Sequence, residues 1–173
     1  MSIHSDHPFL PAESDRSPVR RMRGRLGGAV SLWTAGDENA RSGLTVSSIM
    51  LAEGEPACVL ALLDPDSDFW EQLLDVRVAV VQLLAWEHRL VADVFAGTMP
   101  SPGGPFRSAS FEQSDWGPLL KGATTWAGVR LSEEEPRSVG WSALAVAVIE
   151  HVEVGAESDA LLHRRGRYVR PPG

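Results

Sequence analysis

The sequence predicts a mainly β domain, a barrel or sandwich with a few short helices. Strand-like apolar runs recur along the chain and are separated by turns rich in Gly and Pro. Only two short helical segments are indicated, which argues against a parallel sheet that alternates with helices. With 173 residues, 43% of them hydrophobic, the chain is long enough to build one independent core.

The N-terminal segment, residues 1–18, is predicted to be a flexible arm. It is polar and contains three of the twelve prolines. The folded domain is therefore expected to cover residues 19–173.

Four strands and one helix are predicted in the first half of the domain. Residues 36–39, Gly-Asp-Glu-Asn, supply a hairpin turn between the first two strands. Asp68 and Glu71 fit a capping box for a short helix that ends near Leu74. The predicted strands cover residues 29–33, 43–51, 57–63 and 76–84.

The second half contains one helix, an open segment and three strands. The apolar residues of 90–95 fall on one face of a helix that Gly97 ends. Residues 98–111 are rich in Gly and Pro and predict a loop. The remaining strands are predicted at residues 123–131, 141–154 and 161–169.

Composition excludes several classes of protein. The formal charge of −7 and the pI near 5.2 argue against a nucleic-acid partner, which requires clustered cations. No apolar run is long enough for a membrane helix and no apolar signal segment opens the chain, so a cytoplasmic protein with no membrane partner is expected. The single cysteine, Cys58, lies in an apolar strand and is interpreted as a small buried hydrophobic residue.

Arginines form two clusters, one near each end of the domain. Each cluster has two interpretations: a solvated face, or a source of cations for a ligand phosphate. The clustered residues are Arg20, Arg21, Arg23, Arg25, Arg164, Arg165, Arg167 and Arg170.

The segment 43–48, Gly-Leu-Thr-Val-Ser-Ser, is unusual for a strand. Thr45, Ser47 and Ser48 are small hydroxyl residues where bulky side chains normally alternate. They leave backbone groups and hydroxyls uncovered, which is typical of a strand that a flat polar ligand or another backbone approaches closely.

The order of these motifs along residues 20–170 resembles the flavin reductase-like domain, the FMN-binding split barrel. Two glycines precede the first apolar strand, the Thr/Ser segment follows, and a later apolar strand leads to the turn at residues 64–67. Phe95, Ala96 and Gly97 close a helix, and Gly-Arg-Tyr at 166–168 lies near the end. The resemblance implies a Greek-key split β-barrel that forms a homodimer, with the flavin near the interface.

The same resemblance implies a set of flavin contacts. The Thr/Ser segment matches the stretch that runs along the flavin, Ser67 matches a phosphate-binding hydroxyl, and Phe106 matches an aromatic residue of the following loop. His88 lies where the family often has glutamine and is interpreted as an exposed helix histidine. The implied contacts are Thr45, Val46, Ser47, Ser48, Asp64, Ser67, Phe95, Ala96 and Phe106.

Trp141 departs from the family pattern. Many reductases of this family carry Gly-Asp-His at the start of a late strand, with the histidine near the nicotinamide, whereas this chain has Val139, Gly140 and Trp141. An indole cannot exchange a proton as imidazole does, and its bulk could stack over a flavin or close the pocket. The catalytic residues therefore stay unassigned.

Three aspartates, Asp64, Asp66 and Asp68, bracket Ser67 and form a second departure. At about 6 Å and an effective dielectric of about 20, each would cost a phosphate on the order of 3 kcal/mol. Either the aspartates turn away and pair with the arginine clusters, or the ligand has no phosphate here. The spacing mimics a calcium loop, but Phe69 replaces the required glycine, so no metal is expected.

The expected function is NAD(P)H-dependent reduction of a flavin or a small substrate, with FMN or FAD as the cofactor and an oxygenase as a candidate partner. Hydride transfer is the chemistry of the cofactor, so loss of the family histidine weakens this expectation without removing it. The alternative is a non-catalytic split-barrel protein that holds a flavin or another planar ligand. A third alternative is a dimeric interaction module with a vestigial pocket.

Overall fold

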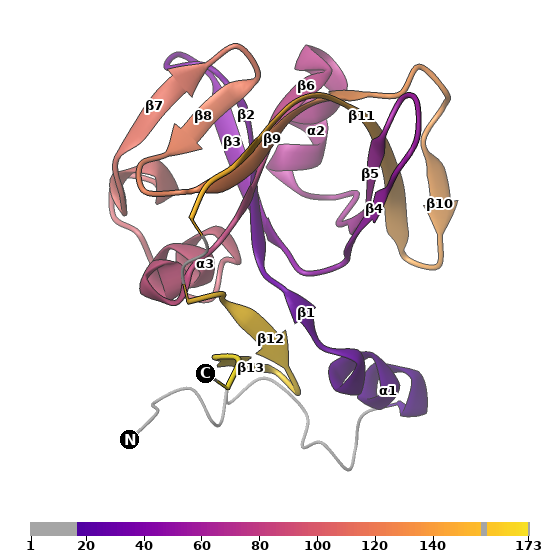
Figure 1. Ribbon diagram of the computed structural model, residues 1–173, viewed down its shortest axis with the longest axis vertical. Coiled ribbons are helices and arrows are strands. Elements are labelled where there is room, and N and C mark those ends of the chain that lie inside the picture. Colours follow the sequence, from indigo (N-terminus) through magenta and orange to yellow (C-terminus); the bar gives the residue numbers. More distant parts are fainter. Residues whose placement is uncertain (1–16, 157–158, 173) are drawn as a thin grey trace.

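The computed structural model describes residues 17–156 and 159–172, and its fold is mainly β with three short helices (Figure 1). The expected N-terminal arm lies outside the described residues except for Ser17 and Pro18. Pro18 already begins a helix, α1 (Pro18–Leu26), whose N-cap is Ser17. No helix in the described part of the chain is long and apolar enough to cross a membrane.

The elements follow one another in mostly short connections. The other helices are α2 (Asp68–Val76), α3 (Arg89–Phe95) and the single 3-10 turns η2 (Trp86–His88) and η3 (Pro105–Arg107). The strands are β1 (Gly28–Ala29), β2 (Ser31–Gly36), β3 (Arg41–Val46), β4 (Ile49–Ala52), β5 (Cys58–Leu63), β6 (Val78–Leu83), β7 (Phe111–Ser114), β8 (Gly117–Leu120), β9 (Thr125–Leu131), β10 (Arg137–Val139), β11 (Ser142–Val154), β12 (Leu162–Arg164) and β13 (Arg167–Val169).

One antiparallel sheet dominates the structure. Its strand order is β3-β2-β6-β9-β11-β5-β4, and β10 pairs with β11 beside this path. The two outermost strands, β3 and β4, are consecutive in the chain and are joined only by Ser47 and Ser48. Two linking residues span at most about 11 Å between the flanking Cα atoms, so the sheet must curl until its two edges meet. The predicted mainly β split-barrel class is confirmed.

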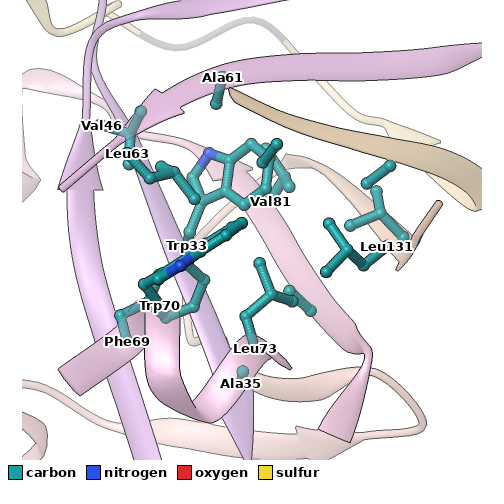
Figure 2. Close-up of a cluster of buried hydrophobic side chains, with 14 of the residues drawn as sticks. Trp33, Ala35, Val46, Ala61, Leu63, Phe69, Trp70, Leu73, Val81 and Leu131 are labelled. Carbon is teal, nitrogen blue, oxygen red and sulfur yellow. The ribbon is translucent and has the colours of Figure 1, made fainter. Parts of the chain in front are cut away.

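The main core lies between the curled sheet and α2. Phe69, Trp70 and Leu73 of α2 point toward Trp33 of β2, and the Trp33 and Phe69 rings meet edge to face with centroids 6.3 Å apart (Figure 2). Burying each side chain of this size contributes about 1.5–3 kcal/mol. A second apolar cluster lies under α3 and includes Phe95. Together these clusters fix the curvature of the sheet and the position of α3.

A small sheet of β1, β12 and β13 lies beside α1 at one end of the molecule (Figure 1). The chain turns between β12 and β13 at Arg165 and Gly166, which have φ values of 53° and 77°. The backbone N–H of Arg165 donates to the carbonyl of Gly24 at 2.8 Å, which ties this turn to α1. The single strand predicted at 161–169 is therefore wrong, because the chain reverses within it.

Two further expectations need correction at their boundaries. The strand predicted over 43–51 is interrupted at Ser47 and Ser48, where the chain passes from one sheet edge to the other. Helix α2 is capped by Ser67, whose hydroxyl accepts from the N–H of Trp70 at 3.2 Å, rather than by Asp68, and it continues to Val76. The hairpin predicted at 36–39 is confirmed, as is the helix ended by Gly97.

Candidate functional site

Ser47 and Ser48 form the seam at which the two edges of the curled sheet meet. Both residues are exposed, and neither hydroxyl has a hydrogen-bond partner among the described residues. Strand edges carry backbone N–H and C=O groups that are not all used by neighbouring strands. The seam therefore offers hydroxyl and backbone hydrogen-bonding groups to a polar ligand.

Neighbouring elements hold the seam on three sides. The carbonyl of Ser48 accepts from the N–H of Leu62 on β5 at 3.1 Å. The carbonyl of Ser47 lies against Gly28, where an added Cβ would come within 3.3 Å of the oxygen. Thr45, just before the seam, donates its hydroxyl to the carbonyl of Ala92 on α3 at 2.7 Å. These contacts fix the seam between β1, β5 and α3.

Thr45 and Val46 lie next to the seam but are used differently from the sequence expectation. The hydroxyl of Thr45 is not uncovered, because it is engaged with α3. The side chain of Val46 is buried in the core, with 4% of its surface exposed. The carbonyl of Val46 accepts the buried hydroxyl of Ser31 at 2.7 Å. Among residues 43–48 only Ser47 and Ser48 are exposed, and Leu44 and Thr45 are half-buried.

Ser67 and Asp64 form the turn between β5 and α2. The hydroxyl of Ser67 donates to the carbonyl of Asp64 at 2.7 Å while it accepts from Trp70, so it serves as a helix cap. The carboxylate of Asp64 accepts from the N–H of Asp66 at 2.9 Å. Asp64, Asp66 and Asp68 are exposed, and none forms an ion pair with a described residue. A phosphate here would have to compete with the cap and with uncompensated carboxylates.

Phe95, Ala96 and Phe106 lie at the end of α3 and in the loop that follows. Phe95 is 4% exposed and meets Phe106 edge to face with centroids 5.0 Å apart. Its ring covers Gly43, where an added Cβ would lie 2.7 Å from Cε1, so β3 needs glycine at this position. Phe106 is half-buried under the guanidinium of Arg41, 4.4 Å from the ring centroid, and Ala96 is exposed. Phe95 thus contributes packing below β3.

Trp141 occupies the two-residue turn between β10 and β11. It is 99% exposed, so within a single chain it closes no pocket. The pairing of Ala143 with Leu63 locates this turn at the end of the sheet where β5 leads into Asp64. Trp141 and the Asp64–Ser67 turn therefore share one end of the sheet.

The interpretation of His88 as an exposed helix histidine is wrong. Its side chain is buried beside η2, and Nδ1 accepts from the N–H of Ala85 at 3.1 Å. Burial lowers the pKa of His88, and the nearby Glu87 carboxylate partly opposes that effect. His88 acts as a neutral structural acceptor.

Two buried polar residues, one beside the seam and one in the core, were not identified from the sequence. Ser31 orients the strand just before the seam, as described above. The Gln82 carboxamide donates to Thr34 Oγ1 at 3.2 Å and accepts from the N–H of Leu120 at 2.7 Å. Each of the two is a polar residue within a mostly apolar strand. A polar residue in that position is buried and needs a hydrogen-bond partner, and this pattern could have identified both residues from the sequence.

A groove of about 650 Å³ lies outside the seam, between α2 and the β2–β3 hairpin. None of the implied flavin contacts lines it, and its carboxylates disfavour an anionic ligand. Among the described residues no group of three His, Cys, Asp or Glu side chains is arranged to hold a metal ion. Cys58 is half-buried, with Sγ 3.7 Å from the carbonyl of Pro56, rather than fully buried as expected.

Comparison with known proteins agrees with the fold and with the order of the motifs. Residues 22–171 match the family described as flavin reductase like domain. A relative from Methylorubrum extorquens, named FMN reductase (NADH) RutF 2, is 26% identical over 164 residues, or 92% of this chain and 91% of that protein.

Solved structures share the fold at lower sequence identity. The NADH:FAD oxidoreductase SgcE6 of Streptomyces globisporus, solved with NAD and FAD fragments, is similar with a TM-score of 0.80 and 20% identity, covering 94% of this chain and 96% of that one. The styrene monooxygenase flavin reductase from Pseudomonas putida has a TM-score of 0.78 and 20% identity, covering 90% and 98%. The resemblance inferred from the motifs is confirmed, and the chain belongs to the flavin reductase-like domain family.

Proposed function

We propose that this protein is an NAD(P)H-dependent flavin reductase that uses FMN or FAD. The single observation that carries the proposal is the seam at Ser47 and Ser48. There, hydroxyls with no partner among the described residues lie together with strand-edge backbone groups, in a chain of this family. A bound flavin would accept a hydride from the reduced nicotinamide at its ring system. The protein's part is to bind and orient the two ligands.

The residues at the seam fit a flavin in two respects. The hydroxyls of Ser47 and Ser48 can donate to or accept from the polar edge of a planar ring. Gly28 has no side chain, so its backbone can lie beside Ser47. A Cβ at this position would already be 3.3 Å from the carbonyl oxygen of Ser47. Thr45 contributes by anchoring the strand to α3, and Phe95 by supporting Gly43 from below.

The turn that holds Trp141 carries no imidazole, because Val139, Gly140 and Trp141 stand where the resemblance places Gly-Asp-His. The exposed indole instead offers a flat apolar surface at one end of the sheet. We therefore propose that turnover of nicotinamide is slow but present. The non-catalytic alternative is not favoured, because the named relatives are reductases.

We also propose a cytoplasmic homodimer. Exposed apolar side chains gather on elements that no described part of the chain covers: α1 presents Val19, Met22 and Leu26, and β4 presents Met50 and Leu51. An exposed apolar surface of this kind is typical of an interface between protein chains. A second copy of the chain is the occupant that would also cover the edge strand β4.

An oxygenase is the proposed acceptor of the reduced flavin. The structural relative from Pseudomonas putida is, by its name, the flavin reductase of a styrene monooxygenase. A reductase with an open seam can release reduced flavin for a second enzyme to use. Which oxygenase receives it does not affect the chemistry proposed for this chain.

The test is a flavin titration followed by turnover. FMN added to the purified protein should lose fluorescence with a dissociation constant in the micromolar range, and NADH should be oxidised only when flavin is present. Flavin binding without NADH oxidation would favour the non-catalytic alternative. No binding at tens of micromolar would contradict the proposed function and favour an interaction module.

A further inference from the structure

The two arginine clusters, which lie far apart in the sequence, meet at one end of the folded chain. Helix α1 and the β12–β13 hairpin lie side by side at the same end of the molecule (Figure 1). We call the combined surface the arginine face. It consists of Arg20, Arg21, Arg23, Arg25, Arg164, Arg165 and Arg167.

The arginine face carries positive charge that the described residues do not neutralise. All seven residues are exposed, and none forms an ion pair within the described part of the chain. Arg170 is excluded from the face because it pairs with Asp159 at 3.2 Å and stacks on Trp86. Seven of the sixteen Lys and Arg residues thus gather at one end of a chain whose formal charge is −7.

His163 lies within the same end of the molecule and adds no charge near neutral pH. Burial lowers its pKa, and the neighbouring Arg23 lowers it further. The positive potential of this face therefore comes from guanidinium groups, whose planar donors match phosphate oxygens in pairs.

The arginine face adjoins the seam through two consecutive glycines. The side chain of Arg164 lies against Gly27, 3.6 Å from the position of an added Cβ. Gly28, the next residue, lies against the carbonyl of Ser47. A ligand that places a ring at the seam and carries an anionic tail can therefore reach the arginines along this pair of glycines.

The alternative position for a phosphate, beside Ser67, is electrostatically worse. The Ser67 hydroxyl already caps α2, and three exposed carboxylates surround the turn without ion pairs in the described structure. On an acidic protein, anionic ligands concentrate where the local potential is positive. Among the surfaces next to the seam, the arginine face meets that condition.

We infer that the arginine face binds the phosphate groups of the ligand that occupies the seam, either the phosphate of the flavin nucleotide or the pyrophosphate of the nicotinamide dinucleotide. This inference rests on the proposed function. It assigns the anionic part of the ligand to α1 and the β12–β13 hairpin rather than to the turn before α2. It also predicts that ligand binding is strongly salt-dependent, because exposed charge pairs are screened.

The decisive experiment compares FMN with riboflavin, which lacks the phosphate, on the full chain. If the arginine face binds the flavin phosphate, the dissociation constant of FMN should rise about tenfold or more in the R23Q/R164Q double variant, whereas that of riboflavin should change less than about twofold. The dependence of FMN affinity on salt should become shallower. R23K/R164K keeps the charge but lacks the planar pair of donors, so it should recover only part of the affinity.

Two controls separate loss of charge from loss of fold. Arg137→Gln removes an exposed arginine from β10, outside the arginine face, and should leave FMN affinity unchanged. Addition of FMN should raise the melting temperature of the wild type more than that of R23Q/R164Q, because a ligand that binds only the native state stabilises it. Equal melting temperatures of the free proteins establish that both fold.

Parallel measurements with FMN, FAD, NADH and riboflavin identify which ligand supplies the phosphate. A loss confined to FMN and FAD assigns the face to the flavin, and a rise in the KM for NADH with FMN affinity unchanged assigns it to the dinucleotide. If FMN, FAD and NADH all respond as riboflavin does, the inference is wrong while flavin binding and the proposed function stand. Absence of binding of both FMN and riboflavin to the wild type would overturn the proposed function as well.

Discussion

Individual hydroxyls at the seam are expected to determine flavin affinity. Replacing Ser47 and Ser48 together by alanine removes two hydrogen-bonding groups, each contributing about 0.5–1.5 kcal/mol. The dissociation constant of FMN should therefore rise roughly tenfold. Fluorescence titration measures it, with Ser138→Ala, an exposed serine on β10, as the matched control. An unchanged affinity would mean that the flavin lies elsewhere.

Trp141 is expected to limit turnover without affecting the fold. Since its side chain is almost fully exposed, Trp141→His should leave the melting temperature unchanged. An imidazole at this turn can exchange a proton near neutral pH, so kcat for NADH oxidation should rise more than FMN affinity changes. Steady-state kinetics on both proteins tests this. A wild type with high turnover would show that the histidine is dispensable.

His88 makes stability dependent on pH. Its pKa is below the ordinary value of 6.5 in the folded state, so the unfolded chain binds the proton more readily. The contribution of His88 to stability is complete above that ordinary value and is lost as the pH falls from there through the folded pKa. His163, also lowered by burial, acts in the same direction.

Denaturant unfolding between pH 8 and pH 5 measures this effect. His88→Gln retains an acceptor for the N–H of Ala85 but cannot be protonated, so its stability should fall less steeply with decreasing pH. A variant that loses stability as steeply as the wild type would assign the pH dependence to other groups.

At the scale of elements, the sequence predicted those helices, strands and turns that depend only on residues close together in the chain. The Gly-Asp-Glu-Asn turn, the buried strands around β5 and β6, and the helix ended by Gly97 follow from side-chain pattern alone. The reversal between β12 and β13 could not be predicted in this way, because Arg165 adopts a left-handed conformation that its residue type does not favour. Helix α1 was missed because none of its residues is buried.

The candidate site was predictable in part for the same reason. The Thr/Ser segment stood out because small hydroxyl residues are rare in strands, and the open positions within it proved to be Ser47 and Ser48. That they join the two edges of one sheet depends on pairing between distant strands, which local pattern does not reveal. The proximity of the two arginine clusters also depends on a long-range contact, the hydrogen bond between the backbone groups of Arg165 and Gly24.

The link between β2, β6 and β8 gives a prediction at the scale of elements. Gln82→Leu removes both hydrogen bonds of the carboxamide and leaves the N–H of Leu120 without its acceptor in the core. The expected loss of unfolding free energy is about 2–4 kcal/mol, because a buried unpaired group costs 1–3 kcal/mol. Urea titration measures it, and Gln113→Leu at an exposed position should cost much less. A loss below about 1 kcal/mol would indicate that water replaces the amide.

For the whole molecule, the proposed dimer gives the clearest expectation. An obligate interface commonly buries more than about 2,000 Å² in total, so the protein should remain dimeric at low micromolar concentration. Light scattering should give twice the 18.7 kDa mass of the chain. Met50→Lys and Leu51→Lys on β4 should shift the mass toward the monomer. A wild type that is monomeric under these conditions would exclude the interface.

The turn that carries Trp141 has a further, optical consequence. Of the six tryptophans, Trp33, Trp70 and Trp126 are buried, and Trp141 alone is almost fully surrounded by solvent. Its indole should therefore emit at the long-wavelength edge of the intrinsic fluorescence and should be the first tryptophan that a soluble quencher such as iodide reaches. Any partner or ligand that covers this end of the sheet would move the emission of Trp141 to shorter wavelength. Trp141 is therefore an intrinsic fluorescent reporter at the turn that departs from the family pattern.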